Sequence, residues 1–290
     1  MTAAFLDTSS AASTQAGERT RRLSLKLLVG VTLLTLLGLY VVFGPLLTGI
    51  DPDAVNLDAR LQSPSSEHWL GTDDLGRDLF TRMAVGGRLT CLIALGTVAI
   101  ASAIAVPLGM LTGFLGGWVD LAATRVVDLF FAIPTLLVAI GIVGVFGPSF
   151  STTILALGLA FWPFYTRLVR SAVVGLRDLT YVDAARVIGA GRWRIIRKEI
   201  VPAMLPMFLV QTTVLLGFAI LDEAGLGFLG LGVQPPTSSW GSLLAQSRAF
   251  ILTFPWMGIV AGIPIVLIVL GINMVADELR DRLDPHGELG

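Results

Sequence analysis

The sequence predicts an all-α membrane protein with six transmembrane helices, and two observations support this fold class. Apolar residues make up 54% of the 290 residues and charged residues only 14%, whereas roughly 25% of a soluble domain is charged. Long apolar runs also recur along the chain, and a helix needs about 20 such residues to cross a bilayer. The formal net charge of −1 provides no basic field that would attract nucleic acid. The lipid bilayer is therefore the expected environment, and no nucleic-acid partner is expected.

Six segments are long and apolar enough to be spans: residues 27–47, 89–115, 126–146, 152–169, 203–221 and 254–276. The first follows Arg21, Arg22 and Lys26, as a signal peptide would, but its apolar run exceeds the usual h-region of about 7–15 residues and no A-x-A site follows. A retained span is therefore favoured over a cleaved signal. The chain divides into a disordered tail (1–24), a transmembrane domain (25–285) and a short tail (286–290).

Basic residues predict the orientation of these spans. Six crossings place both termini on one side of the membrane, and the segment 167–202, on that same side, carries eight of the 20 lysine and arginine residues. Since short cytoplasmic loops are enriched in Lys and Arg, both termini and both tails are predicted to be cytoplasmic. The acidic segment 48–88 and the glycine- and proline-rich segment 222–253 then lie outside.

The segment 167–202 is predicted to form a helix–turn–helix element. Thr180 and Asp183 have capping-box spacing, Gly189 allows a turn, and a second helix is expected to end near Pro202. Two alanines after Asp183 would leave a flat patch for another surface. A solvated loop whose charges only set the topology is the alternative, and composition alone leaves both interpretations open.

No motif in the sequence indicates enzymatic chemistry. Residues 225–230 fit G-x-G-x-x-G but lack a βαβ setting, and no P-loop or hydrolytic triad is present. Cys91 is the only cysteine, and His68 and His286 have no partners at metal-ligand spacing. We expect no enzyme activity, no cofactor and no metal site.

Four polar residues are candidates for a solute pathway: Gln211 and Thr212 within the fifth span, and Asp222 and Glu223 at its outer end. Charge inside a bilayer marks ion or solute routes. Polar side chains also join helices to one another, so this interpretation stays open beside the first.

The sequence Asp183-Ala-Ala, followed by Gly189 and then Glu199-Ile-Val-Pro202, resembles the EAA loop of ATP-binding-cassette importer permeases. In that family the loop forms a cytoplasmic coupling helix that docks into a cleft on the ATPase subunit. Asp replaces the usual Glu and keeps its charge, whereas Glu199 and Val201 depart from the pattern beyond the docking turn. The resemblance implies a coupling role for six residues: Asp183, Ala184, Ala185, Arg186, Gly189 and Ala190.

Further stretches at 68–78, 227–241 and 279–285 resemble the oligopeptide/dipeptide/nickel permeases, closest to their second, C-type chain. The resemblance implies a type I permease core formed by the last five helices, within a bacterial inner or plasma membrane. It also implies three kinds of partner: a homologous B-type permease, two ATPase domains and an extracytoplasmic substrate-binding protein. Residues expected to contact the binding protein or to gate the pathway are Gly71, Asp73, Asp74, Arg77, Asp78, Gly227, Gly230, Gln234, Pro235 and Trp240.

These features predict an ATP-driven peptide importer subunit that forms half of a pathway, with ATP hydrolysis on other subunits. Nickel, haem or glutathione are alternative cargoes within the same family. An ATP-independent carrier or channel is disfavoured, because few charges lie within the spans and no internal repeat is visible. A structural scaffold would not need such a docking loop.

Overall fold

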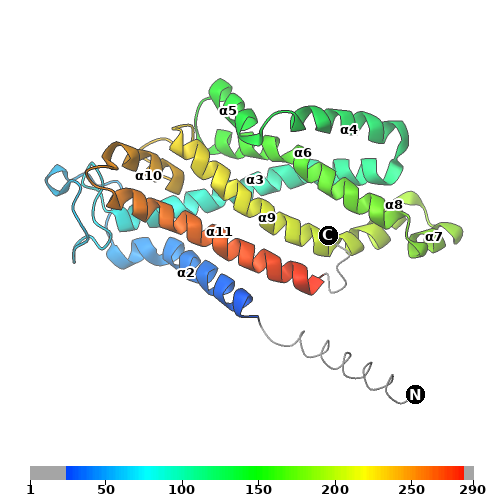
Figure 1. The fold of residues 1–290 in the computed structure, drawn as a ribbon, viewed down its shortest axis with the longest axis horizontal. Coiled ribbons are helices and arrows are strands. Elements are labelled where there is room, and N and C mark those ends of the chain that lie inside the picture. Colours follow the sequence, from blue (N-terminus) through cyan, green and yellow to red (C-terminus); the bar gives the residue numbers. More distant parts are fainter. Residues whose placement is uncertain (1–23, 284–290) are drawn as a thin grey trace, which may run out of the picture.

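The computed structural model describes residues 24–283, and no strand occurs within this range. Five long helices run alongside one another in an elongated bundle (Figure 1): α2 (Leu25–Thr48), α3 (Leu79–Leu115), α6 (Phe150–Arg177), α9 (Val201–Phe228) and α11 (Trp256–Leu283). The shorter elements are η1 (Leu57–Ala59), α4 (Gly117–Phe131), α5 (Thr135–Phe146), α7 (Thr180–Val187), α8 (Arg192–Ile195), η2 (Ile196–Ile200), α10 (Trp240–Ser247) and η3 (Arg248–Phe250). The predicted all-α fold class is confirmed. The tail 286–290 and residues 1–23 of the other predicted tail lie outside the described residues.

The predicted span 126–146 is not one continuous helix. Two helices, α4 and α5, replace it and meet at a bend of 82°. Pro134 causes the break because it lacks an N–H donor and disfavours helical geometry at Ile133. Helix resumes where the Pro134 carbonyl accepts from the N–H groups of Leu137 and Val138. Five helices are each long and apolar enough to cross a membrane, and the bent pair provides a sixth candidate.

The second span begins ten residues earlier than predicted. Asp78 caps α3 by accepting from the Thr81 N–H at 2.8 Å, so the helix starts at Leu79 rather than near residue 89. Two arginines in this added part have partners: Arg82 lies 3.0 Å from Asp53, and Arg88 donates to the Val41 carbonyl of α2. Because these charges are paired, they are compatible with a helix, although hydropathy alone predicted a loop here.

The helix after residue 192 does not end at Pro202. α8 continues through η2, a π-helical segment, into α9. The Val201 N–H bonds to the Ile196 carbonyl, five residues back. This wider turn shifts the hydrogen-bond register, and Pro202, which has no N–H, is accommodated in the first turn of α9.

Small residues bring the long helices close together. A Cβ built on Gly109 of α3 would lie 2.7 Å from the Cβ of Val169 on α6, and one on Gly158 of α6 would meet Ile100 of α3 at 2.7 Å. Such close approaches are typical of helix pairs within membranes. The start of α2 and the end of α11 meet where Ser24 bonds to Glu278.

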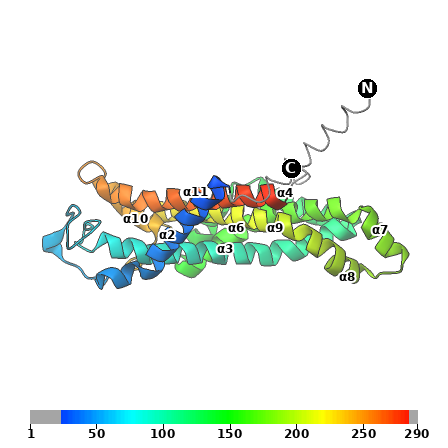
Figure 2. The same cartoon turned by 90° about the horizontal axis from the view of Figure 1, so that it is seen from below.

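The bundle has two distinct ends. At the α7 end, the α7–α8 hairpin projects beyond the long helices, and the start of α2 and the end of α11 lie toward this end (Figures 1 and 2). At the opposite end, the α10 end, residues 49–78 form a folded segment that we call the polar cap.

Candidate functional site

The α7–α8 hairpin is anchored on one face and exposed on the other. Val182 and Ala185 of α7 pack in a buried cluster with Val173 of α6, and this cluster also contains Ile195, Ile200 and Met204. On the outer surface, Val187 is 86% exposed and Ile188 81% exposed. Large apolar side chains with this exposure mark a surface suited to a protein partner.

Only one of the two predicted docking alanines faces outward. Ala185 is buried against α6, whereas Ala184 is exposed. The helical repeat of 3.6 residues turns neighbouring positions by about 100°, so both cannot share the outer face. The prediction of a flat two-alanine patch is therefore wrong, and the outer face combines Ala184 with Tyr181, Val187 and Ile188.

The predicted capping box at the start of α7 is absent. Leu179 occupies the N-cap position, with no side-chain cap, and Thr180 is the first helical residue. Asp183 still lies in the first turn, where its charge suits the positive end of the helix. Partial burial, followed by the charge of Glu199, raises the pKa of Tyr181.

Arg186 ties α7 to the neighbouring span. Its Nη1 donates to the Asp183 carboxylate at 2.8 Å and its Nη2 to the carbonyl of Arg177 at 3.0 Å. The second bond caps the last turn of α6 with a positive charge, as the helix dipole favours. Arg186 is therefore a direct mechanical link between α7 and α6.

Gly189 ends α7 through a Schellman motif. The Gly189 N–H bonds to the Arg186 carbonyl and the Ala190 N–H to the Ala185 carbonyl, each at 3.0 Å. Gly189 has a φ of +82°, a left-handed conformation that glycine adopts without strain. The residue determines the sharp turn between α7 and α8.

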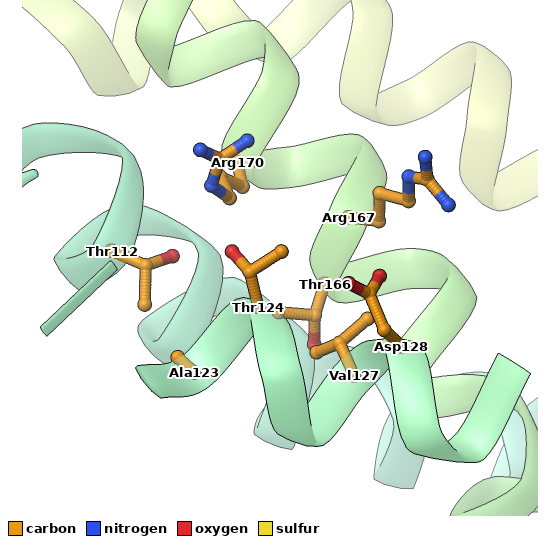
Figure 3. A pocket seen from close by; sticks show the side chains of 8 residues that line it. All are labelled: Thr112, Ala123, Thr124, Val127, Asp128, Thr166, Arg167 and Arg170. Carbon is orange, nitrogen blue, oxygen red and sulfur yellow. The ribbon is translucent and has the colours of Figure 1, made fainter. Parts of the chain in front are cut away.

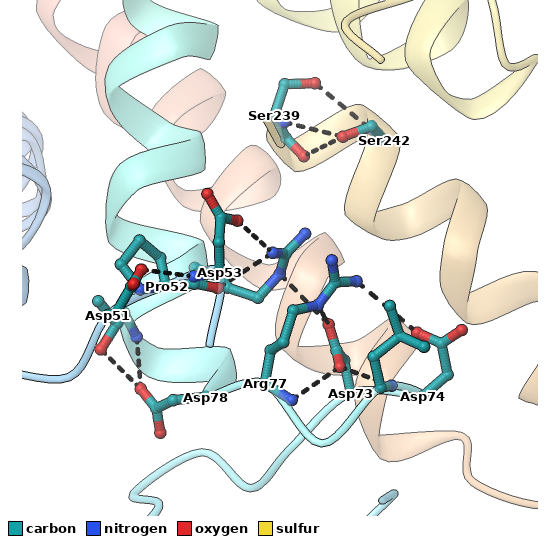
Figure 4. Close-up of polar contacts among 12 residues, drawn as sticks. Asp51, Pro52, Asp53, Asp73, Asp74, Arg77, Asp78, Ser239 and Ser242 are labelled. Atoms are coloured by element: carbon teal, nitrogen blue, oxygen red, sulfur yellow. Dashed lines mark hydrogen bonds and ion pairs between the residues drawn. The ribbon is translucent and has the colours of Figure 1, made fainter. Parts of the chain in front are cut away.

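In the polar cap, Asp73 is the centre of a buried network of charges (Figure 4). Its carboxylate accepts from the N–H of Leu75 and Arg77 and from the Arg77 Nε at 2.7 Å. Arg82 of α3 lies 3.3 Å from the same carboxylate and 3.0 Å from Asp53. Nearby, the Asp78 carboxylate bonds to the His68 ring at 2.9 Å and accepts from the Thr81 N–H of α3 at 2.8 Å. The network fastens the cap to the first turn of α3.

Most predicted contact residues of the cap are internal. Asp73, Asp78 and Arg77 are 0%, 1% and 6% exposed, and Gly71 is also buried. Their burial contradicts direct contact with a partner in this conformation, and the alternative, that they gate the pathway, stays a prediction. Asp74 is partly exposed and can still be touched from outside.

At the junction between α9 and α10, Gly227 and Trp240 serve packing. A Cβ on Gly227 would lie 2.8 Å from the backbone of Gly241, and Trp240 is fully buried with its Nε1 donating to the Met83 carbonyl at 2.8 Å. Gly230, with a φ of +78°, ends α9 in a second Schellman motif.

Two predicted contact residues in the connection between α9 and α10 remain accessible. Gln234 and Pro235 are exposed, and the Gln234 amide braces this turn by donating to the carbonyls of Gly230 and Gly232.

The four predicted pathway residues do not form one site. Thr212 hydrogen-bonds to Tyr165 of α6 and so joins two helices, which supports the second of the two interpretations given above. Glu223 is fully buried beside Thr90 and Ser239, and neither of its carboxylate oxygens has a hydrogen-bond partner of good geometry. The Glu223 side chain is therefore out of contact with solvent. Gln211 and Asp222 are half-buried.

No group of three or more His, Cys, Asp or Glu side chains that could hold a metal ion occurs among residues 24–283.

The structural positions of two groups of charged residues were not predicted from the sequence. Arg82 was predicted to be a charge in an outer loop. The i, i+4 spacing of Asp73 and Arg77, close to Arg82 in the sequence, could have indicated that this region contains ion pairs. Arg167 and Arg170 were assigned to a cytoplasmic loop, but both lie within α6. Their spacing of three residues places them on one face of that helix.

The helical bundle, with five helices long and apolar enough to cross a membrane, defines a multi-pass membrane protein. A family profile described as the binding-protein-dependent transport system inner membrane component matches residues 105–286. The chain belongs to this family, which confirms the resemblance drawn from its motifs.

Relatives and a solved structure agree with this assignment. Dipeptide transport system permease protein DppC of Alkalihalophilus pseudofirmus is 43% identical, over 89% of this chain and 85% of that protein. Probable D,D-dipeptide transport system permease protein DdpC of Escherichia coli K12 is 41% identical over 87% and 85%, and nickel transport system permease protein NikC of the same organism is 40% identical over 81% and 85%. An inward-facing MetNI methionine ABC transporter chain has the same fold, with a TM-score of 0.56 and 20% identity over 70% of this chain and 96% of that chain.

Proposed function

We propose that this chain is a permease subunit of an ATP-driven peptide importer in a bacterial inner membrane. It forms half of the pathway with a homologous B-type permease, and a binding protein delivers the peptide from outside. Two separate or fused ATPase domains hydrolyse ATP, so the chain itself is not an enzyme. The identities of 43% and 41% to dipeptide permeases support peptide as the cargo.

The observation that carries this proposal is the exposed hairpin fixed between two long helices. Its outer face is free for a partner, while Arg186 and the buried valines attach its inner face to α6 and its second half is continuous with α9. A partner that moves α7 must therefore move α6 and α9, which is the linkage that alternating access requires. Asp183, Ala184, Arg186, Gly189 and Ala190 build the docking turn.

The orientation follows from the same arrangement. The α7 end carries the hairpin with its concentration of arginines, and the start of α2 and the end of α11 point toward it (Figure 1). This distribution supports a cytoplasmic location for the α7 end and both termini. The polar cap then faces the binding protein.

Exchanging Gly189 tests the coupling. Val at 189 is strained by the positive φ, whereas Val at Gly191, with a φ of −67°, adopts an ordinary extended backbone. We expect Gly189→Val to abolish peptide uptake and peptide-stimulated ATP hydrolysis by the complete transporter, with unchanged membrane abundance. Gly191→Val is the matched control and should retain most uptake. Normal uptake by both variants, and by Asp183→Lys, contradicts the coupling role.

Nickel is the second candidate cargo, since a nickel permease is 40% identical. Cells with and without this subunit are compared for uptake of labelled dipeptides, longer peptides and radioactive nickel. We expect only peptide uptake to depend on the subunit. Dependence of nickel uptake alone, or of haem or glutathione uptake in parallel assays, assigns one of the alternative cargoes instead.

A further inference from the structure

A cavity of about 170 Å³ lies between α3, α4 and α6, outside all the residues discussed as pathway candidates (Figure 3). Its polar lining consists of Thr112, Thr124, Asp128, Thr166, Arg167 and Arg170. These side chains come from three helices, and the Arg167 guanidinium points away from Arg170 and Thr112 (Figure 3).

The cavity lies toward the α7 end of α3 and α6, two helices that are each long and apolar enough to cross a membrane. α6 has 28 residues, so it is about 42 Å long, and Arg170 lies about 10 Å before its end. Arginine at this depth is costly unless it faces a partner or water. Charged side chains within spans are rare and mark routes for solutes or ions.

Two charged residues at the cavity form an ion pair with each other. Two further charged residues, of opposite sign, form no ion pair. Arg170 forms an ion pair with Asp120, its Nη2 donating to the carboxylate at 2.6 Å. Asp128 and Arg167 form no ion pair with any described residue, although Arg167 lies over the Phe131 ring at 5.3 Å. Asp128 also interacts electrostatically with Arg170, so the cavity presents one carboxylate and one guanidinium that lack a direct ion-pair partner among the described residues.

A third polar group in the cavity wall also lacks a partner. Thr166 is 2% exposed, and its hydroxyl makes no hydrogen bond within the described part of the chain. In contrast, the Thr112 hydroxyl bonds to the Leu108 carbonyl at 2.8 Å. A buried hydroxyl without a partner costs about 1–3 kcal/mol, which a bound polar group or water recovers.

A second cavity, of about 130 Å³ and lined mostly by apolar side chains, lies at the bend between α4 and α5. Phe131, Pro134 and Phe164 are among its walls, and Phe131 also carries the Arg167 guanidinium. Irregular backbone at membrane depth occurs where it faces protein or a water-filled space rather than lipid. The bend is therefore expected to face the pathway.

We propose that these two cavities form a peptide-contacting site on this chain, in which Arg167 binds the peptide carboxylate, Asp128 binds its ammonium group, and the apolar cavity receives an apolar side chain. This inference rests on the proposed function and specifies its substrate as a short zwitterionic peptide. The two charges and the single hydroxyl match the polar ends of such a peptide. They do not select among the side chains of the peptide.

The test uses the complete transporter reconstituted in lipid without the binding protein, so that selection upstream does not intervene. A dipeptide containing p-benzoylphenylalanine is photo-crosslinked, and labelled positions are identified by mass spectrometry. We expect labelling in α4 to α6, weakened about tenfold when the probe is N-acetylated or amidated. Arg167→Gln and Asp128→Asn should each weaken labelling similarly, and each should abolish the discrimination against its own blocked terminus.

Two further variants keep the test decisive. Arg125→Gln is the matched control, because Arg125 precedes Asp128 by one turn but does not line either cavity, and it should label normally. If an Arg167 variant does not assemble, Thr166→Val replaces the hydroxyl with a methyl group of similar size and should reduce labelling about fivefold.

Two outcomes overturn the proposal, and they differ in meaning. If the intact transporter imports peptide but Arg167→Gln, Asp128→Asn and Thr166→Val all label like the unchanged protein, the site is wrong and the proposed function stands. If the transporter imports only nickel or another non-peptide cargo, both are wrong.

Discussion

At the residue scale, single glycines and one buried carboxylate determine the shape of the polar cap. Gly76 has a φ of +73°, and a Cβ there would lie 1.7 Å from the Asn56 carbonyl oxygen. Asp73 lies between two arginines that have little access to water. Both positions are intolerant of change for reasons that do not involve a partner.

Gly76→Ala should destabilise the protein more than Gly49→Ala. Both glycines have positive φ, so both substitutions cost about 1–2 kcal/mol in backbone strain. Only position 76 adds a clash with backbone, since nothing lies within 4 Å of a Cβ at position 49. Thermal unfolding of the purified transporter measures the difference, and equal shifts in Tm would refute the assigned contact.

Asp73→Asn should cost about 3–5 kcal/mol of stability, because it leaves Arg77 and Arg82 with too little negative charge in a buried site. Asp58→Asn is the control, since Asp58 is exposed. The same unfolding measurement distinguishes them. A neutral effect at position 73 would mean that the buried network contributes no stability.

At the element scale, the close contact of α9 and α10 depends on facing glycines. A Cβ on Gly241 would lie 2.7 Å from the Ala224 backbone, and one on Gly227 would meet the Gly241 backbone at 2.8 Å. Neither helix can retreat easily, because Trp240 locks α10 to α3 through the Met83 carbonyl.

Gly227→Ala should therefore push α10 away from α9 and cost about 1–3 kcal/mol, as overpacking does. Gly225→Ala, two residues earlier, meets nothing within 4 Å and should be neutral or slightly stabilising, because alanine favours helix. Unfolding temperatures of the two variants provide the test. Similar destabilisation by both would indicate that helix propensity, not packing, controls this region.

At the scale of the whole molecule, the two ends of the bundle are predicted to face opposite sides of the membrane. In a Cys91→Ser background, Val187→Cys should react with a membrane-impermeant maleimide only in inside-out vesicles. Leu57→Cys in the polar cap should react only in intact spheroplasts. Both residues are exposed, so accessibility is not limiting. Labelling of both from the same side would contradict the assigned orientation.

Local signals in the sequence anticipated much of the fold and part of the site. Apolar runs predicted the positions of the spans, and the charged hairpin was found by its turn glycine and its motif. Pro134 indicated a kink, but not that it would divide the span into two helices, because a proline allows either a kink or a break. The helical start at Leu79 was not predicted, because its paired arginines resemble loop residues. The outward and inward faces of α7 were also undetermined, since they depend on where α6 lies.

The sequence by itself determined that the chain is a membrane protein and approximately which segments cross the membrane. It also determined which family the chain resembles. These properties depend on hydropathy and on motifs that are continuous along the chain. Only the tertiary structure decided which polar residues are available. It buried Glu223 and Asp73, used Thr212 to join helices, and left Arg167 and Asp128 unpaired beside a cavity. The physical reason is that burial and pairing arise between helices far apart in the sequence, where packing alone brings side chains together.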